Sequence, residues 1–345
     1  MSLCTGYGAL DLAVERVCDT ETRWVSDIDA DAVAVQTVRF PDATQLGDLK
    51  QVNWGQYVGQ VDVITAGYPC QPFSAAGQRK GLADERHIWP WIAEAIRVLR
   101  PGTVVLENVQ GHLRLGFDIV VGDLAAMGRT ARWGVVRASD TGAPHRRARL
   151  FIVSHLADPN GDRSQRFSQL NRDTPPRVNS GNWGHADRHG MEIAVGPVVA
   201  DPDGTGLEGA EPAERCDVSA GRDCAPADPD GTAGDSERVN ARSPVYEPCK
   251  VERFGRRHRM DDAAEPVDWQ RFGPAIRRWE AIMGRSAPAP LVDGTKQLNA
   301  RLVEWMMGLP EGWVTDLIPN RRALKTLGNG VVPQQAEMAL RMLLT

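Results

Sequence analysis

The sequence lacks the features that mark metal-binding, disulfide-rich or membrane proteins. Its six cysteines, spread over 345 residues, form no CxxC pair and accompany no paired histidines, which argues against a zinc site and a disulfide framework. No apolar run is long enough to span a membrane, and Met1 leads directly into structured sequence without a signal peptide. We therefore expect a protein of the reducing cytoplasm that holds no metal.

Lysine is scarce, and net positive charge is absent. Only five of the 40 basic residues are lysines, and the formal net charge is -5. A nucleic-acid-binding surface would therefore have to be a local patch. Arginine suits bidentate recognition of phosphate or guanine, although a GC-rich genome gives the same bias.

The first part of the chain alternates short apolar runs with amphipathic segments. Its pattern predicts strands over 23–29, 61–67, 103–109 and 149–154, with helices over 30–40 and 87–100. Strands that alternate with helices imply a parallel sheet covered on both faces. The first strand is short, because only Ser2 and Leu3 precede a glycine turn. Helical periodicity returns near the end, over 298–310 and 336–344.

Between about residues 155 and 290 the pattern becomes irregular. The pentapeptide Ala-Asp-Pro-Asn/Asp-Gly begins at Ala157, Ala200 and Ala227, and each copy is a strong turn signal. We interpret these copies as similar surface turns, because the uneven spacing argues against a solenoid. Calcium binding is the alternative, although no copy has the ligand spacing of an EF-hand loop.

A glycine turn and two acidic residues suggest a nucleotide-like ligand. Gly6 and Gly8 lie between the first strand and a helix, where the backbone can approach a ligand at the helix N-terminus. Asp27 follows the next strand, where a carboxylate can bind ribose hydroxyls, and Asp48 is placed to meet an adenine amino group. The turn could bind a dinucleotide, S-adenosylmethionine or nothing; Asp11 in place of the third glycine of the dinucleotide fingerprint argues against NAD.

A second group of polar residues follows other predicted strands. Cys70 lies beyond the strand over 61–67 and Glu107 lies near the end of the strand over 103–109, while Arg147 and Arg149 enter the next strand. Open α/β sheets bind ligands at the carboxyl ends of their strands. A lone cysteine is usually a buried apolar residue, but neighbouring arginines favour the thiolate and the setting Pro-Cys-Gln-Pro is polar, so Cys70 is predicted to be a nucleophile.

These residues resemble the DNA (cytosine-5) methyltransferase family, of prokaryotic or phage type. The similarity covers five motifs in the family's order: GYPCQPFSAAGQRKG around Cys70, the triplet Glu107-Asn108-Val109, the run 145–149, the helix over 301–310 and the C-terminal segment 327–333. The chain departs from the usual residues at several motif positions: Cys4, Ala9, His145, Thr326 and Gly330.

The resemblance implies a Rossmann-like S-adenosylmethionine-dependent fold with a smaller, irregular target-recognition domain. It implies that Cys70 attacks carbon 6 of cytosine, that Glu107 holds a proton on ring nitrogen 3, and that Arg149 holds the base. Arg147 would support the site, the base would be flipped out of the duplex, and the segment 74–85 would close over it as a lid. The implied residues around S-adenosylmethionine are Thr5, Gly6, Tyr7, Gly8, Asp27, Ile28, Asp48, Leu49, Pro69 and Asn329.

The predicted domains are a catalytic and cofactor-binding domain over 1–155, a target-recognition domain over 156–290, and a return to the catalytic domain over 291–345. Arginines interleaved with aromatic residues over 251–285 suit DNA contacts, although the helix around Trp279 could equally pack against the domain. We expect a cytoplasmic monomer that methylates double-stranded DNA in a prokaryotic or phage-infected cell. Its role would be in restriction-modification or anti-restriction, with or without a cognate endonuclease. The alternatives are an RNA (tRNA) cytosine-5 methyltransferase and a DNA-binding module without turnover.

Overall fold

The computed structural model describes residues 1–69, 88–156, 193–194 and 267–344. By its internal contacts the chain divides into two units, one made of 1–200 with 259–345 and the other of 201–258. Everything described below belongs to the first unit. The second unit and much of the predicted target-recognition domain lie outside the described residues, so the predicted domain boundaries stay predictions.

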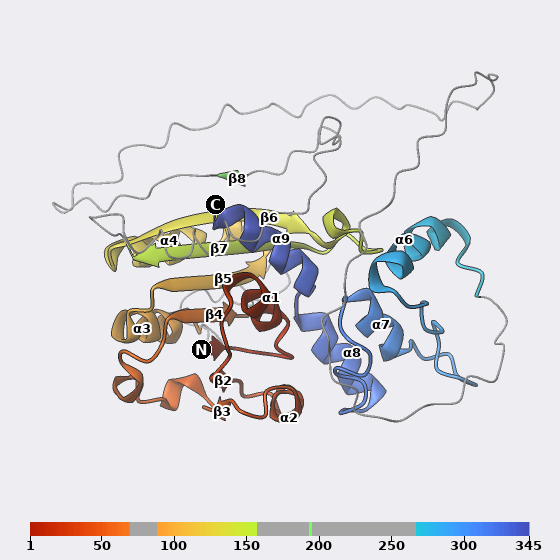
Figure 1. Cartoon of the computed structure of the whole chain (residues 1–345), viewed down its shortest axis with the longest axis horizontal. Helices are drawn as coiled ribbons and strands as arrows, with labels where there is room; N and C mark the ends of the chain where they lie inside the picture. The colour runs from red at the N-terminus through yellow and green to blue at the C-terminus, as the bar shows by residue number, and fades with distance from the viewer. Residues whose placement is uncertain (70–87, 157–192, 195–266, 345) are drawn as a thin grey trace, which may run out of the picture. The chain divides into compact units, whose positions relative to one another are not determined.

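A mixed sheet forms the centre of this unit (Figure 1). Its strand order, within the described residues, is β3-β2-β1-β4-β5-β7-β6-β8. The strands are β1 (Ser2–Leu3), β2 (Trp24–Ser26), β3 (Thr44–Gln45), β4 (Val63–Gly67), β5 (Thr103–Val109), β6 (Arg129–Arg137), β7 (Ala148–Leu156) and β8 (Ile193–Ala194). β3, β2, β1, β4 and β5 pair in parallel.

The predicted parallel sheet is wrong for the strand over 149–154. β7 pairs antiparallel with β5 and with β6, with Val109 opposite Arg149 at one end and Thr103 opposite His155 at the other. The reason is the connection: β6 and β7 are joined by a short segment without a crossover helix, and a parallel pair would need one. The consequence is that β7 begins at the edge of the sheet where β4 and β5 end.

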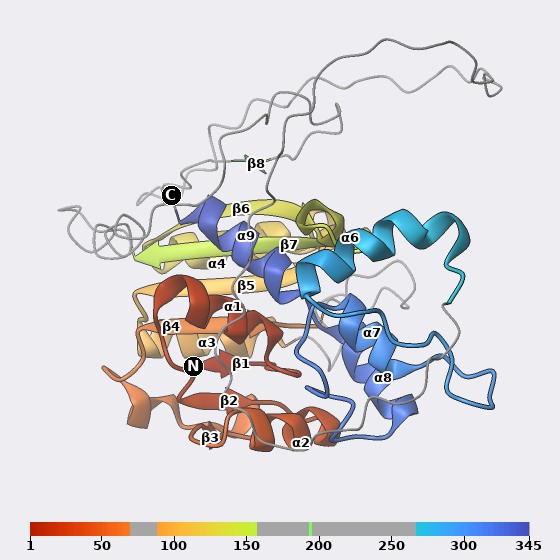
Figure 2. The same cartoon turned by 45° about the vertical axis from the view of Figure 1, so that its right-hand side comes forward.

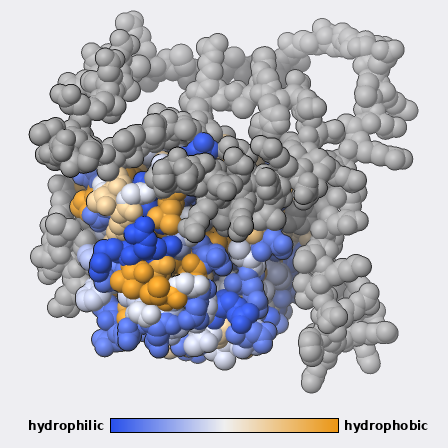
Figure 3. Space-filling model, turned by 60° about the vertical axis from the view of Figure 1, so that its left-hand side comes forward, coloured by the Kyte–Doolittle hydropathy of each residue, from blue (hydrophilic) through white to orange (hydrophobic). Residues whose placement is uncertain are grey.

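Helices cover both faces of the sheet (Figures 1 and 2). α1 (Ala9–Cys18) and α9 (Pro333–Leu343) pack on one face, in one apolar core with Val105 and Phe151. α3 (Trp89–Leu99) and α4 (Phe117–Ala126) cover the other face, in a second core with Ile64 and Leu106. Coverage of both faces, as predicted, is therefore confirmed. On the face in Figure 3, hydrophobic side chains form a patch bordered by hydrophilic ones.

The remaining helices are α2 (Ala30–Arg39), α6 (Gly273–Met283), α7 (Ala300–Met306) and α8 (Asn320–Asn329). α2 begins where the Asp29 side chain accepts a hydrogen bond from the Asp31 amide, and α9 begins at a proline. In α6, Trp279 is fully buried and its Nε1 donates to the Trp305 carbonyl at 2.9 Å. This supports packing, one of the two interpretations of this helix. The arginine- and aromatic-rich residues at 253–259 lie outside the described residues.

Candidate functional site

The glycine turn between β1 and α1 has the conformation that a close backbone approach requires. Gly6 and Gly8 have positive φ angles of 58° and 80°, which side-chain-bearing residues rarely adopt. A Cβ on Gly8 would also overlap the ring of Phe40. The Gly6 amide donates to the Asp27 carboxylate at 2.8 Å, so that the turn after β1 and the acid after β2 are held together. Thr5 joins them, because its hydroxyl donates to the Ser26 carbonyl.

Polar and apolar groups lie around this turn. Asp27 and Asp48 both raise the pKa of the Cys4 thiol, although burial is the main reason that it reaches about 12. Both carboxylates are therefore close to the turn, and the thiol stays neutral. Leu49 is buried, whereas Ile28 is 80% exposed beside Asp27. An aliphatic side chain this exposed next to carboxylates could cover the flat face of a ligand.

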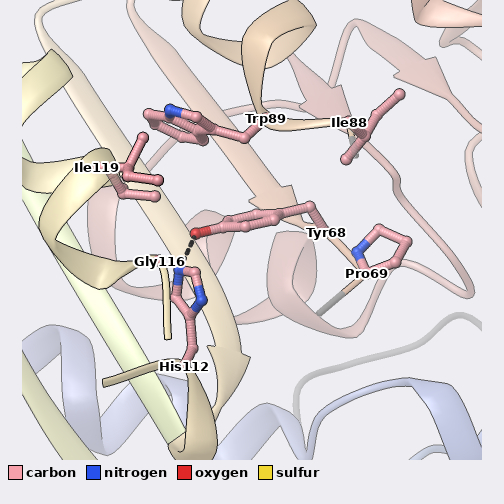
Figure 4. A pocket seen from close by; sticks show the side chains of 8 residues that line it. Tyr68, Pro69, Ile88, Trp89, His112, Gly116 and Ile119 are labelled. Atoms are coloured by element: carbon pink, nitrogen blue, oxygen red, sulfur yellow. Dashed lines mark hydrogen bonds between the residues drawn. The ribbon is translucent and has the colours of Figure 1, made fainter. Parts of the chain in front are cut away.

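The end of β4 is fixed by a buried hydrogen-bonded pair. The Tyr68 hydroxyl lies 2.9 Å from His112 Nε2, and the Tyr68 ring packs against Trp89 at a centroid distance of 5.7 Å (Figure 4). Asn108 Nδ2 donates to the Tyr68 carbonyl at 3.2 Å. Burial lowers the pKa of His112 to about 4, so its imidazole is neutral at pH 7. Pro69 follows and is exposed, while Cys70 and the predicted lid over 74–85 lie outside the described residues.

The pattern of motifs did not identify Tyr68 and His112. The available signal was a tyrosine two residues before the cysteine and a histidine five residues after Glu107, but the sequence does not show that the two side chains meet. Together with Trp89, Ile88 and Ile119 they line a cavity too small for more than a single water (Figure 4). The pair therefore anchors the end of β4.

We expect Tyr68→Phe to lower the free energy of unfolding by about 1–3 kcal/mol, because it removes the hydroxyl partner of a buried imidazole. Urea unfolding measures the change, with an unchanged m-value. Tyr57→Phe is the control, since this ring makes an edge contact with Trp24 and is only half-buried. Equal losses in both variants would contradict the assigned role of the hydrogen bond.

Glu107 and Arg149 meet at the carboxyl edge of β5. Arg149 Nε lies 2.9 Å from Glu107 Oε1, and both side chains are largely buried, at 14% and 9% exposure. Burial raises the pKa of Glu107 to about 7, outweighing the opposite effects of Arg149 and Arg147. Glu107 Oε1 has no hydrogen bond of good geometry in the described part of the chain. A buried carboxyl that is half-protonated near neutral pH is suited to proton transfer.

Arg147 has other partners than Arg149. Its guanidinium donates to the carbonyl of Gly328 at 2.7 Å and to that of Gly330, and its φ angle of 32° is positive. It thus binds the end of α8, where Asn329 is exposed. The segment after α8 also reaches the glycine turn, because the Tyr7 hydroxyl donates to the Val331 carbonyl at 2.9 Å.

The antiparallel direction of β7 explains how these groups come together. Apart from Asn329, the predicted site residues that the structure describes follow β1, β2, β3 or β4, lie near the end of β5, or lie at the start of β7, all at one edge of the sheet. Asn329 joins them through the segment after α8. Among the described residues, no group of three or more histidine, cysteine or acidic side chains could hold a metal ion. In the same ranges no helix is both long and apolar enough to cross a membrane.

Comparison with known proteins gives one family. The family model described as C-5 cytosine-specific DNA methylase matches residues 1–189. The chain is 33% identical to the type II methyltransferase M.NlaX of Neisseria lactamica over 176 residues, which cover 49% of this chain and 55% of the relative. It is 29% identical to M.NgoMIV of Neisseria gonorrhoeae over 213 residues, covering 56% of this chain and 65% of that protein. It is 27% identical to M.NlaIV of Neisseria lactamica over 173 residues, which cover 45% of this chain and 41% of that protein.

The matches thus span about half the length of these curated relatives. Among solved structures, a DNMT2 mutant from Spodoptera frugiperda is 22% identical with a TM-score of 0.40, covering 46% of this chain and 50% of that one. The Entamoeba histolytica methyltransferase EhMeth is 20% identical with a TM-score of 0.38, covering 46% and 52%.

Proposed function

Because the chain belongs to the C-5 cytosine-specific DNA methylase family, we propose that it transfers a methyl group from S-adenosylmethionine to carbon 5 of cytosine in double-stranded DNA. Its fold is the Rossmann-like α/β fold of S-adenosylmethionine-dependent methyltransferases. The observation that carries the proposal is the buried Glu107–Arg149 pair, which lies at the same sheet edge as the glycine turn. A carboxyl with a pKa of about 7 suits the protonation of a pyrimidine ring nitrogen.

The residues around the glycine turn fit S-adenosylmethionine, the cofactor of this family. Asp27 accepts hydrogen bonds from the Gly6 and Asp29 amides, and a carboxylate has further lone pairs for ribose hydroxyls. Asp48 would bind the adenine amino group, while Ile28 would cover the adenine face. Thr5, Gly6, Tyr7, Gly8, Leu49, Pro69 and Asn329 would complete the site. When bound, the cofactor supplies an electrophilic methyl group.

The chain's own residues would activate the base. The Cys70 thiolate adds to carbon 6, and Glu107 protonates ring nitrogen 3, so that carbon 5 becomes nucleophilic. Arg149 holds the base, and Arg147 supports the site through its bonds to Gly328 and Gly330. Loss of the carbon 5 proton and elimination of the Cys70 sulfur then release the product. The cytosine must leave the duplex to reach these groups.

We further propose the finer roles. The residues over 156–290 form the target-recognition domain, between the catalytic domain over 1–155 and its return over 291–345. The protein acts as a monomer in restriction-modification or anti-restriction, with any cognate endonuclease acting on the same DNA site without a stable complex.

Labelled S-adenosylmethionine tests the activity directly. The protein is incubated with duplex DNA or with tRNA, and methyl transfer to each is counted. We expect label in DNA, and mapping 5-methylcytosine in a methylation-free host that expresses the gene would give the target sequence. Label in tRNA alone would make the protein an RNA methyltransferase, and no label in either would make it a binding module.

Ile28→Ala tests the position of the cofactor. We expect affinity for S-adenosylmethionine to fall about tenfold, because the ligand loses apolar contact area, while stability changes by less than about 0.5 kcal/mol. Val38→Ala is the matched control, since Val38 is another exposed aliphatic residue, at 51%, on the neighbouring α2. Calorimetric titration measures the affinity of both variants for S-adenosylmethionine. Equal affinities in the two variants would contradict adenine binding at Ile28.

A further inference from the structure

Tyr7 has an unusual place in the glycine turn. Its side chain is 1% exposed and belongs to the apolar core that α9 shares. The hydroxyl donates to the Val331 carbonyl at 2.9 Å, and burial raises the pKa of this phenol, so it stays a donor. The Tyr7 carbonyl accepts from Trp313 Nε1 at 2.8 Å. The middle of the turn is therefore held at two atoms by residues more than 300 positions later in the chain.

Gly330 lies directly against this ring. A Cβ on Gly330 would overlap three atoms of the Tyr7 side chain, Cε1, Cζ and the hydroxyl oxygen. The backbone does not require glycine, because the φ angle of Gly330 is -89°, which any residue adopts. What requires glycine here is the space that the ring of Tyr7 fills.

Gly328, two residues earlier, offers the opposite case. A Cβ there would have no neighbour within 4 Å, and its φ angle is not in the positive range. Its carbonyl accepts from Arg147, as that of Gly330 does. The two glycines thus share a backbone anchor and differ in their contact with Tyr7.

We propose that the ring of Tyr7 packs into the space left by the absent side chain of Gly330, and that through this contact the segment after α8 fixes the glycine turn and so sets the affinity for S-adenosylmethionine. Tyr7 is a positioning residue in this inference, which rests on the proposed function. A larger residue at position 330 would displace the ring, break the bond to Val331 and move the amide of Gly6 away from Asp27. A smaller side chain at position 7 would remove the need for glycine at position 330.

A double-mutant cycle tests the pair. We expect Gly330→Ser to lower affinity for S-adenosylmethionine at least about tenfold, as overpacking of a filled core does, and Gly328→Ser to change it less than about twofold. In a Tyr7→Ala background the same Gly330→Ser change should cost less than about twofold. Since Tyr7→Ala leaves a cavity and can fail to fold, Tyr7→Leu provides a second background with the same expectation. Titration calorimetry measures affinity for the folded fraction.

Hydrogen exchange of the peptide over 5–8, measured without ligand, gives a second arm of the cycle. Gly330→Ser should speed exchange there in the Tyr7 protein and not in the Tyr7→Leu protein. Unchanged affinity in Gly330→Ser, or a penalty that persists in both backgrounds, would overturn the inference. A wild-type protein that binds S-adenosylmethionine without methylating DNA would contradict the proposed function alone. If the wild type binds no S-adenosylmethionine, the hydrogen-exchange comparison still tests whether the contact between Tyr7 and Gly330 fixes the glycine turn.

Discussion

Cys70→Ser should abolish methyl transfer, with a loss of about 10⁴-fold or more, while affinity for DNA and for S-adenosylmethionine stays close to that of the wild type. A serine hydroxyl at neutral pH is not ionised, and no group that we assign to the site would remove its proton. The arginines that we predict to neighbour Cys70 would favour its thiolate. Without addition at carbon 6, carbon 5 of cytosine is not nucleophilic enough to take the methyl group.

Cys18→Ala is the control for this substitution. The Cys18 thiol is buried and its pKa is raised to about 11, so it does not react, and its replacement should leave methyl transfer unchanged. DNA containing 5-fluorocytosine gives a second readout, because the fluorine cannot leave as the carbon 5 proton does. The wild type and Cys18→Ala should form a denaturation-resistant complex with it, and Cys70→Ser should not. Near-normal turnover in Cys70→Ser would remove Cys70 from the mechanism.

The strands and the motif residues could be predicted from the sequence because their signals are local. Apolar runs such as 61–67 and 103–109 identify β4 and β5, and chemistry-bearing residues stand after the first run and near the end of the second. The direction of β7 could not be predicted in this way, because direction depends on which strand it pairs with. α4, β6 and α8 were not predicted; α8 is polar overall, with only Ala323, Thr326 and Leu327 buried.

Contacts between distant segments explain the rest. Glycine at position 330 can be interpreted from the sequence only as a departure from the family's usual residue, but the structure shows that the ring of Tyr7 occupies the space that a side chain there would need. Tyr68 and His112 are likewise separated by 44 residues and joined by one hydrogen bond. The roles assigned to the individual site residues remain predictions.

Glu107→Gln should lower turnover by about 10²- to 10⁴-fold and at the same time stabilise the protein above neutral pH. Glutamine keeps the size of the side chain, but its amide cannot pass a proton to ring nitrogen 3. In the wild type, methyl transfer should fall as pH rises through about 7, because the buried carboxyl then loses its proton. The ion pair with Arg149 does not prevent this, since burial outweighs it.

Glu107→Gln should lower turnover but raise stability above neutral pH, and the gain in stability follows from the same raised pKa of Glu107. The folded-state pKa of Glu107, about 7, lies above the ordinary value of 4.5, so the stability that its proton contributes is fully present below about pH 4.5 and is lost as pH rises through 7. This loss amounts to about 3 kcal/mol. Glu107→Gln should remove this loss. In urea unfolding, the stability of the variant relative to the wild type should therefore be higher at pH 8 than at pH 5. Glu94→Gln, on the solvent side of α3 beside Arg97, is the control and should change neither quantity. A variant that is inactive without this gain would mean that Glu107 is charged in the folded protein, and that an ion pair, not a protonated carboxyl, prepares the site for cytosine.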